Sequence, residues 1–246
     1  MLRKKSGIII IGNEIISGKT LDKNSNFLCK RLTEIGIDVD EVCVIKDIEK
    51  KIIEKVRFFS SKYDFVFTTG GIGPTHDDIT SNSVAKAMNL KLVLNPEAKN
   101  RLEKHYSDDV LTNARLKMAY LPETASLIDN PVSIAPGFQI KNVYVFPGVP
   151  KILQIMFEEF FEKIANGKKV YQKNLTTTLS EGIIGDYIES VQKMFLELEI
   201  GSYPYFKKNF FGVSLVIKGD KKTKVDQATK KIFNYLKSAN GNPRLF

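Results

Sequence analysis

The segment from Tyr63 to Thr80, YDFVFTTGGIGPTHDDIT, holds residue types that suit the binding of a phosphate group. Gly70, Gly71 and Gly73 allow positive φ angles and let backbone N–H groups come close to a ligand. A helix that begins near Thr80 would add unpaired N–H groups and the positive end of its dipole. The segment therefore predicts an anion site on a turn between a strand and a helix.

Four carboxylates are expected near this turn. Asp77 and Asp78 follow the glycines, and Glu14 and Asp47 follow two earlier strand patterns. Carboxylates beside a phosphate repel it unless a cation lies between them, and a hard divalent ion can take oxygen ligands from both. We expect Mg²⁺, with Co²⁺ or Mn²⁺ as alternatives, and phosphoanhydride or phosphoryl chemistry. In the structural alternative, the turn is merely tight and Asp77 or Asp78 is the N-cap of the helix.

An alternation of strand and helix patterns must position these residues. Gly7 to Ile11 is a β-branched apolar run, typical of a strand buried on both faces. A helix capped by Asp22 or Asn24 follows and stops at Gly36. Further strands are expected at 37–45, 63–68 and 142–146, and further helices at 48–61, after Thr80 and at 151–164. The alternation predicts an α/β fold, a three-layer α/β/α arrangement with a mostly parallel sheet.

Four unusual loop sequences follow the expected strands. They are GNE at 12–14, KD at 46–47, the glycine turn at 70–78 and PGVP at 147–150. In open parallel sheets, ligands bind outside the carboxyl ends of the strands, so we expect these loops to form one site. Residues 108–140 are less regular and contain three prolines.

Two nucleotide-binding motifs are excluded by their spacing. GNEIISGKT resembles a P-loop, but five residues separate Gly12 from Gly18 where the P-loop has four. GGIGPTH does not fit the dinucleotide fingerprint, because His76 stands where the last glycine belongs. We expect His76 to be a surface turn residue, with a general base as the alternative.

The composition is that of an ordinary globular protein, with 43% hydrophobic and 26% charged residues in a chain of 246. We find neither a secretion signal nor an apolar run long enough to cross a bilayer. Cys29 and Cys43 lack the number and spacing of disulfide or metal sites, so we expect core thiols and a cytoplasmic location. The net charge of +9 would suit nucleic acid, but the lysines are dispersed without interleaved aromatics. We expect anionic small molecules instead.

The chain is expected to form two domains. The polar, glycine-broken stretch IANGKKVYQK places a boundary near Gly167. Residues 1–167 then form the large domain with the site. Residues 168–246 carry a β-α-β-β-α pattern, which predicts a small α+β domain.

Five ordered motifs carry a resemblance to a known family: GNEIISGKTLDKNSNFLCKRLTEIGIDV, VIKD, TTGGIGPTHDDIT, NPVSIAPGF and FPGVPKILQIMF. Over residues 6–165 the chain resembles the MoaB/Mog molybdopterin-binding domains. Within them it is most similar to the amino-terminal domain of CinA competence/damage-inducible proteins and to the related domain of eukaryotic FAD synthase. LSEG and IGSYP resemble the KH-like domain that follows in this group. A CinA protein would next carry its amidase domain, which we expect to be absent.

The resemblance implies a domain that binds a nucleotide or pterin phosphate and forms a homodimer or homotrimer. By the family's motifs, Asp47 and Asp78 are the catalytic carboxylates and hold the metal ion. The substrate-binding residues expected from the motifs and loops are Glu14, Asn24, Ser25, Thr69, Gly70, Gly71, Gly73, Pro74, Thr75, Asp77, Pro147 and Gly148. The small domain lacks the GxxG loop with which KH domains bind nucleic acid, so we expect an oligomerisation or site-covering element.

The activity that the resemblance implies is metal-dependent cleavage of the pyrophosphate in an ADP-ribose-like or FAD-like dinucleotide. A non-catalytic pterin or nucleotide carrier and a molybdopterin adenylyltransferase stay open as alternatives, because fold does not fix function. Ile72 stands where the pterin enzymes usually have threonine or serine, which favours the CinA branch. Ser133 replaces an expected glycine in NPVSIAPG, which puts a close backbone approach there in doubt.

Overall fold

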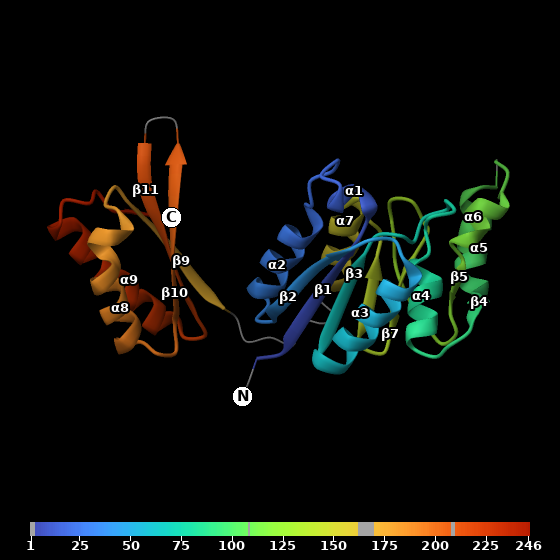
Figure 1. The fold of residues 1–246 in the computed structure, drawn as a ribbon, viewed down its shortest axis with the longest axis horizontal. Helices are drawn as coiled ribbons and strands as arrows, with labels where there is room; N and C mark the ends of the chain where they lie inside the picture. Colours follow the sequence, from blue (N-terminus) through green and yellow to red (C-terminus); the bar gives the residue numbers. More distant parts are fainter. Residues whose placement is uncertain (1–2, 108, 162–169, 208–209) are drawn as a thin grey trace. The chain divides into compact units, whose positions relative to one another are not determined.

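The computed structural model describes residues 3–107, 109–161, 170–207 and 210–246. The chain divides into two compact units, Met1–Gly167 and Lys168–Phe246, each with a hydrophobic core of its own (Figure 1). The boundary expected near Gly167 lies outside the described residues, as does the end of the helix expected to reach residue 164.

The first unit is built on a six-stranded sheet in the order β2-β1-β3-β8-β7-β6. The first four strands are parallel, and β7 runs antiparallel to both of its neighbours. The bounds are β1 Lys5–Ile11, β2 Asp38–Ile45, β3 Phe65–Thr69, β6 Ser126–Ile128, β7 Gly137–Ile140 and β8 Val143–Phe146. The predicted α/β class with a mostly parallel sheet is confirmed.

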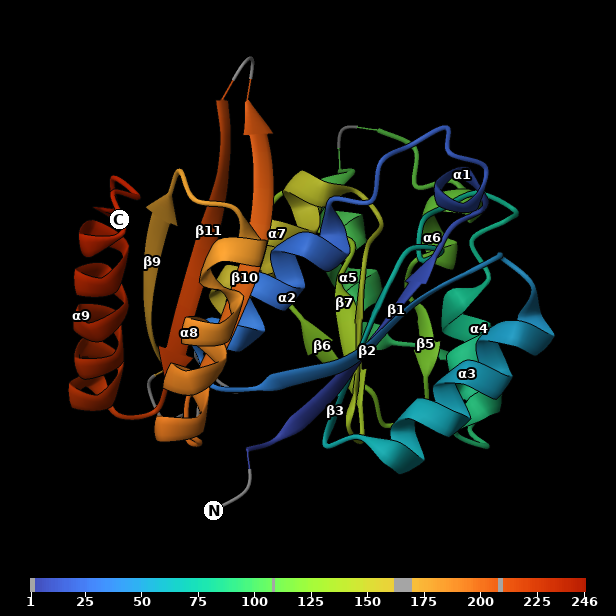
Figure 2. The same ribbon diagram turned by 60° about the vertical axis from the view of Figure 1, so that its left-hand side comes forward.

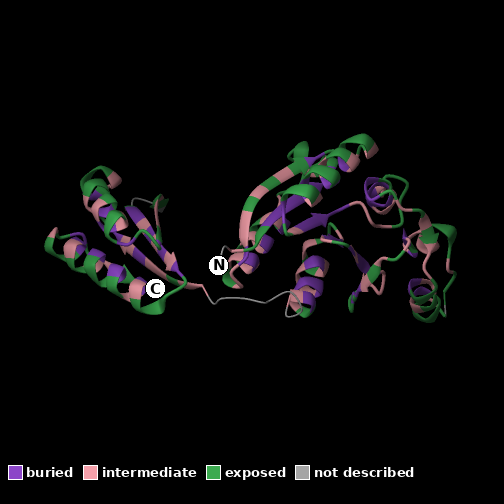
Figure 3. Ribbon diagram, turned by 90° about the horizontal axis from the view of Figure 1, so that it is seen from below, coloured by how far each residue is buried: buried purple, intermediate pink, exposed green. Residues whose placement is uncertain are grey.

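Helices cover both faces of this sheet. The helices α2 (Asn24–Glu34) and α7 (Pro150–Phe161) lie on one face, and α3 (Glu49–Lys62) and α4 (Thr80–Ala87) lie on the other (Figure 2). Successive side chains of β1 point to opposite faces of the sheet, so this strand packs against both helix layers. Ile8 and Ile10 pack with α2 and α7, whereas Ile9 and Ile11 pack with α3 and α4. Figure 3 shows the buried residues concentrated between the layers.

Phenylalanine rings fill the layer between the sheet and α7. The ring of Phe157 is fully buried and lies 5.8 Å, centroid to centroid, from the rings of both Phe27 and Phe67. Its distance to Phe146 is 5.9 Å and to Phe161 is 6.5 Å. The strand β3, the strand β8 and two helices therefore meet at this one side chain.

The segment expected to be irregular contains short elements. They are α6 Asn113–Lys117 and β5 Tyr120–Pro122, followed by β6 and β7. β4 Leu92–Leu94 and α5 Pro96–His105 precede this segment, and a further short helix, α1 Asn13–Ile16, follows β1. The strands β4 and β5 form a separate two-stranded sheet. Alternation cannot be recognised over three or four residues, and β5, β6 and β7 lack the continuous apolar run that marked the equally short β8, which is why they were missed.

The second unit contains the five expected elements and one more strand. Its elements are β9 Tyr171–Thr177, α8 Glu181–Met194, β10 Glu199–Lys207, β11 Phe210–Gly219, α9 Lys222–Ser238 and β12 Arg244–Leu245. The four strands form an antiparallel sheet in the order β10-β11-β9-β12. The added strand β12 pairs with β9 and closes a βαββαβ arrangement.

Two other expectations can be compared with the structure. None of the helices in the described ranges is long and apolar enough to cross a bilayer. Cys29 and Cys43, expected as core thiols, form no disulfide and are half-buried; each packs against the apolar core on one side of the six-stranded sheet. Burial nevertheless raises the pKa of Cys43 to about 11.

The substitution Phe157→Ala should lower the free energy of unfolding of the first unit by about 3–5 kcal/mol, because four rings would border an unfilled cavity. Guanidinium unfolding followed by circular dichroism measures the change, and the transition of the second unit should keep its midpoint. Phe58→Ala is the matched control: this side chain is 51% exposed, and its loss should cost less than about 1 kcal/mol. Equal losses for the two variants would contradict the packing described above.

Candidate functional site

The glycine turn begins at Gly70, where β3 ends between β1 and β8. The N–H of Gly70 donates to the carbonyl oxygen of Phe146 at 3.1 Å. A Cβ on Gly70 would lie 2.0 Å from the carbonyl oxygen of Ile11, and the φ angle of Gly70 is +103°. A Cβ on Gly148 would lie 3.2 Å from the Cα of Gly70. Glycine is therefore required at position 70, and three loops meet there.

The first residue of α4 holds the turn from its other side. Thr80 donates its N–H to the carbonyl oxygen of Gly71 at 2.9 Å and its hydroxyl to that of Gly70 at 2.8 Å. The N–H groups of Gly71, Ile72 and Gly73 have no acceptor among the described residues. Consecutive unpaired N–H groups beside the positive end of a helix are well suited to bind phosphate oxygens.

A cavity of about 600 Å³ opens at the carboxyl ends of β1, β2, β3 and β8, within the size range of small-molecule sites. All four loops that the sequence analysis singled out contribute to its lining. The predicted residues that line it are Glu14, Asp47, Gly70, Gly71, Gly73, Pro74, Asp77, Asp78, Pro147 and Gly148. The predicted surface residue His76 is exposed and is not part of this lining.

Thr75 positions the two adjacent aspartates. Asp78 Oδ2 accepts the N–H of Thr75 at 2.8 Å and its hydroxyl at 2.6 Å, and Asp77 Oδ1 lies 2.5 Å from the same hydroxyl. This hydroxyl lowers the pKa of Asp77. The helix α4 has Ile79 as its N-cap residue and no side-chain cap, so the structural alternative in which Asp77 or Asp78 caps this helix is wrong. Both carboxylates bond within their own loop instead.

Asp47 connects the first loop with the glycine turn. Its Oδ2 accepts the N–H of Asn13, in the short helix α1, at 2.8 Å. Its Oδ1 lies 3.6 Å from the place that a Cβ on Gly71 would take. Burial is the main cause that raises the pKa of Asp47, and repulsion by Glu14 and Asp77 adds to it, against the hydrogen bond from Asn13.

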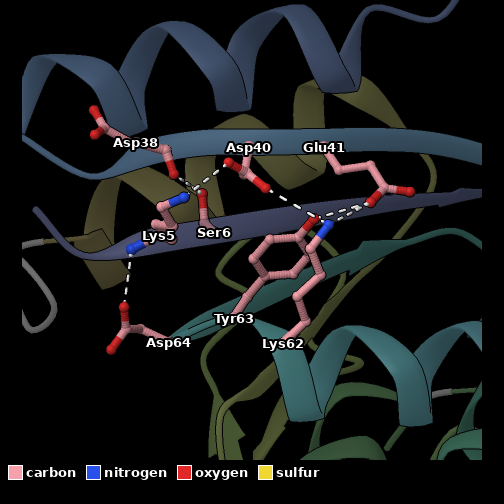
Figure 4. A network of polar contacts seen from close by, with 8 residues as sticks. All are labelled: Lys5, Ser6, Asp38, Asp40, Glu41, Lys62, Tyr63 and Asp64. Atoms are coloured by element: carbon pink, nitrogen blue, oxygen red, sulfur yellow. Dashed lines mark hydrogen bonds and ion pairs between the residues drawn. The ribbon is translucent and has the colours of Figure 1, made fainter.

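Carboxylates toward the amino ends of the same strands have a different environment (Figure 4). Asp40, Glu41 and Asp64 each bond to a lysine or a tyrosine, and these bonds hold their pKa values below the usual range. The bonds are Lys5–Asp40 at 3.2 Å, Tyr63–Glu41 at 2.9 Å and Lys4–Asp64 at 2.5 Å. Among the described residues that line the cavity, by contrast, there is no lysine, arginine or histidine.

Four of the predicted substrate-binding residues are not among the residues that line the cavity. Asn24 is 6% exposed and donates to Thr69 Oγ1 at 2.9 Å and to the carbonyl oxygen of Gly148 at 2.8 Å. Ser25 bonds to Asp22, whose carboxylate also accepts the N–H of Asn24 at 2.9 Å. The N-cap residue of α2 is Lys23, so the expectation that Asp22 or Asn24 caps this helix is wrong. Thr75 bonds to the two aspartates described above. These four side chains hold the loops that carry the lining residues.

The sequence analysis missed an apolar side of the cavity, formed by Ile72, Tyr106, Met118 and Ala135. The guanidinium of Arg115 lies 4.0 Å from the centroid of the Tyr106 ring and fixes its position. Met118 lies in the segment without a regular pattern and Tyr106 directly follows α5, so nothing in their spacing indicated a site. Their side chains form a surface that suits a flat ring system.

The NPVSIAPG segment also reaches the cavity, through Asn130 and Ser133. Asn130 Nδ2 donates to Ser133 Oγ at 2.7 Å, and the N–H of Ser133 donates to Asn130 Oδ1 at 3.1 Å. These bonds close a turn in which Ile134 has a φ of +64°. A serine at position 133 is therefore part of the turn, and the segment approaches the cavity without the glycine that we expected there.

The oxygen ligands around the cavity fit a divalent ion that brings further ligands with it. Glu14, Asp47, Asp77 and Asp78 offer only carboxylate oxygens, which hard cations prefer. No group of three histidine, cysteine, aspartate or glutamate side chains in the described ranges is close enough to hold a metal alone. Mg²⁺ is typically bound by one or two carboxylates together with water and substrate phosphates, which matches this arrangement.

Comparison with known proteins agrees with this architecture. Residues 7–166 match the family described as probable molybdopterin binding domain, and residues 169–242 match the FAD synthase middle domain. A protein of Archaeoglobus fulgidus is 36% identical over 223 residues, which cover 91% of this chain and 94% of that protein. The crystal structure of a CinA protein with unknown function from Thermoplasma acidophilum has 34% identity and a TM-score of 0.63, and the match covers 66% of this chain and 98% of that one.

Two longer relatives share both units. A probable FAD synthase of Caenorhabditis briggsae is 33% identical over 241 residues, covering 87% of this chain and 46% of that protein. A CinA-like protein of Thermosipho melanesiensis is 32% identical over 235 residues, covering 92% of this chain and 57% of that protein. The chain thus spans about half the length of these two relatives. The chain belongs to the molybdopterin-binding domain family, and within it resembles the CinA-like proteins and the FAD synthases.

Proposed function

We propose that the first unit is a divalent-metal-dependent pyrophosphohydrolase that cleaves ADP-ribose-like or FAD-like dinucleotides. One observation carries the proposal: unpaired N–H groups of the glycine turn and four carboxylates belong to the same cavity, with no cationic side chain among the described lining residues. The N–H groups suit an anionic substrate, whereas the carboxylates repel it. A cation that binds with the substrate removes this conflict.

The carboxylates, the residues that orient them and the N–H groups of the glycine turn each have a role in the proposed reaction. Asp47 and Asp78 would hold the ion, which we expect to be Mg²⁺, with Mn²⁺ or Co²⁺ as alternatives. When bound, such an ion polarises phosphoryl oxygens and lowers the pKa of a bound water. The N–H of Asn13 orients Asp47, and Thr75 orients Asp78. The N–H groups of Gly71, Ile72 and Gly73 bind phosphate oxygens and stabilise the charge that develops on them.

The substrate class follows from the rest of the lining. The apolar side, with Ile72, Tyr106 and Met118, suits the flat ring of a nucleotide or flavin. The relatives named FAD synthase and CinA-like support a dinucleotide over a mononucleotide. We place the pyrophosphate at the glycine turn and one ring against Tyr106.

The second candidate is a pterin or nucleotide carrier without turnover, which the description of the family favours. The same cavity can hold a pterin phosphate, since the ring surface and the N–H groups suit both ligands. Calorimetric binding of a pterin phosphate without its conversion would support a carrier, and adenylate transfer to it from ATP would support the molybdopterin adenylyltransferase. Ile72 places an apolar side chain in the turn, which counts against the transferase.

Asp47→Asn and Asp78→Asn should each lower kcat/KM for the hydrolysis of ADP-ribose or FAD by about 10²-fold or more, because each removes a ligand charge of the ion. Chromatography of the mononucleotide products, with Mg²⁺, Mn²⁺ or Co²⁺ present, measures the rates. Asp64→Asn is the matched control, since Asp64 lies toward the opposite ends of the strands and bonds to Lys4. It should retain the wild-type rate.

Two results would contradict this assignment. One is the absence of cleavage by the wild type with every ion and both substrates. The other is cleavage that survives in Asp78→Asn as well as in Asp64→Asn.

Asp47→Asn should also stabilise the metal-free protein at neutral pH. Because the folded-state pKa of Asp47 is raised, its ionised form costs stability once the pH rises through that pKa. The asparagine removes this cost and can still accept the N–H of Asn13. We expect a gain of up to about 1 kcal/mol, which vanishes below about pH 4, where the aspartate is protonated in both states.

Thermal unfolding at neutral and acid pH, with and without Mg²⁺, tests this change. Mg²⁺ should raise the Tm of the wild type more than that of Asp47→Asn, because it binds the folded protein. A lower Tm of the variant at neutral pH would show that the charge of Asp47 does not destabilise the folded protein. An equal response of both proteins to Mg²⁺ would show that Asp47 does not hold the ion.

A further inference from the structure

The sheet of the second unit has one covered face and one open face. Val213, Leu215 and Ile217 of β11 pack in a core with α8 and α9. Because side chains alternate along a strand, Ser214 and Val216 lie on the opposite face. The helices α8 and α9 of this unit both lie on the covered side (Figure 1). In the open face, β11 and β9 are the central strands and β10 and β12 the edges.

Two tyrosines of β10 lie along the open face. Tyr203 pairs with Ser214, and Tyr205 pairs with Gly212. A Cβ on Gly212 would lie 2.6 Å from the hydroxyl of Tyr205, and one on Gly201 would lie 2.7 Å from the hydroxyl of Tyr203. The rings therefore occupy the space that the glycines leave above the sheet. They present aromatic surface to solvent, and Tyr203 is 58% exposed.

A cavity of about 910 Å³ lies on this face between β10 and β12. Thr176 and Ser214 of the central strands line it, together with Tyr205, Arg244 and Phe246. Phe246 is 75% exposed. The cavity therefore combines small hydroxyl side chains with aromatic rings on both sides.

The charge of the open face is positive. Among the described residues, no aspartate or glutamate side chain lines the cavity, and Arg244 forms no ion pair. Glu199, on the same face, is paired with Lys218 at 2.6 Å. The guanidinium of Arg244 is thus the charged side chain that a ligand in this cavity would meet.

Most of the surplus charge of the chain belongs to the second unit. Residues 168–246 contain 14 lysines and arginines and 7 acidic residues, whereas residues 1–167 contain 23 and 21. The second unit therefore carries +7 of the net +9. The surplus arises because this unit has few acidic residues, not because the lysines cluster in it, and a surplus of positive charge attracts polyanions.

We propose that the open face of the second unit binds single-stranded nucleic acid. Bases stack on Tyr203, Tyr205 and Phe246, and Arg244 contacts a backbone phosphate. A four-stranded sheet with exposed aromatic rings is a known platform for unpaired bases, and it needs no GxxG loop. The second unit does contain the spacing GxxG, as GIIG at 182–185, but these residues lie in the helix α8 and form no loop. The lack of such a loop, from which we expected an oligomerisation or covering element, therefore does not exclude this ligand.

Fluorescence anisotropy with the full chain and a labelled RNA of about 12 nucleotides tests the proposal. Affinity should fall as salt rises. Loss of one stacking ring in Tyr203→Ala or Tyr205→Ala should weaken binding between about 5-fold and 150-fold, and the phenylalanine variants should retain it. Arg244→Gln should weaken binding. It should also reduce the slope of log affinity against log salt concentration by about 1, the value of one phosphate contact.

Lys230→Gln is the matched control, because it removes the same charge from an exposed position on α9, on the covered side of the sheet. It should change affinity by less than about 2-fold, as should Asp78→Ala in the first unit. Single-stranded DNA of the same sequence should bind if stacking dominates, and a preference for RNA would indicate contacts to the 2′-hydroxyl. Both results support the face as a site for unpaired bases.

Three results would overturn the proposal. Equal affinity for duplex and single strand, with equal losses in Arg244→Gln and Lys230→Gln, would show attraction by bulk charge alone. Absence of binding at low salt would exclude this ligand. A dimer in light scattering that dissociates in Tyr203→Ala, without RNA binding by either form, would show that a second copy of the chain covers the face.

Discussion

At Gly70 the ends of three parallel strands come so close that no side chain fits between them. A Cβ there would lie 2.0 Å from the carbonyl oxygen of Ile11, and the N–H of Gly70 bonds to Phe146. This contact brings the loops after β1, β3 and β8 to one place. It also turns the chain away from the sheet, so that the next three N–H groups have no acceptor among the described residues. The cavity depends on this approach, because its lining comes from those loops.

The parts of the site that lie next to a strand could be predicted from the sequence. The apolar run of Gly7–Ile11 marks a buried strand, and alternation with helices makes the sheet parallel. Parallel strands end at one edge, so Glu14, Asp47 and Asp78 had to approach one another. Short-range signals were sufficient there, because each residue lies in the connection that directly follows its strand. The alternation of strand and helix patterns likewise predicted that helices cover both faces of the sheet in the first unit.

Longer-range packing could not be predicted in this way. Tyr106 and Met118 reach the cavity only through the packing of α5 and α6, which leaves no periodic trace in the sequence. Asn24 was expected at the substrate, but a nearer acceptor, the carbonyl of Gly148, takes its amide. The alternative in which Asp77 or Asp78 caps α4 fails for a similar reason, since Asp78 bonds to Thr75 in its own loop. The strand β12 has two residues, too few for any pattern.

The two proposed sites would bind an anion in opposite ways. In the first unit, carboxylates line the cavity and the pKa of Asp47 is raised, so under our proposal attraction would come from backbone N–H groups and from a cation that arrives with the substrate. The lysines of that unit neutralise other carboxylates, as Lys4 does for Asp64. In the second unit, the side chains themselves supply the attraction, through Arg244 and the net charge of +7. The first arrangement favours a compact ligand that can share a metal ion. The second favours an extended polyanion, because its charge is spread over the unit and its aromatic rings lie along an open sheet.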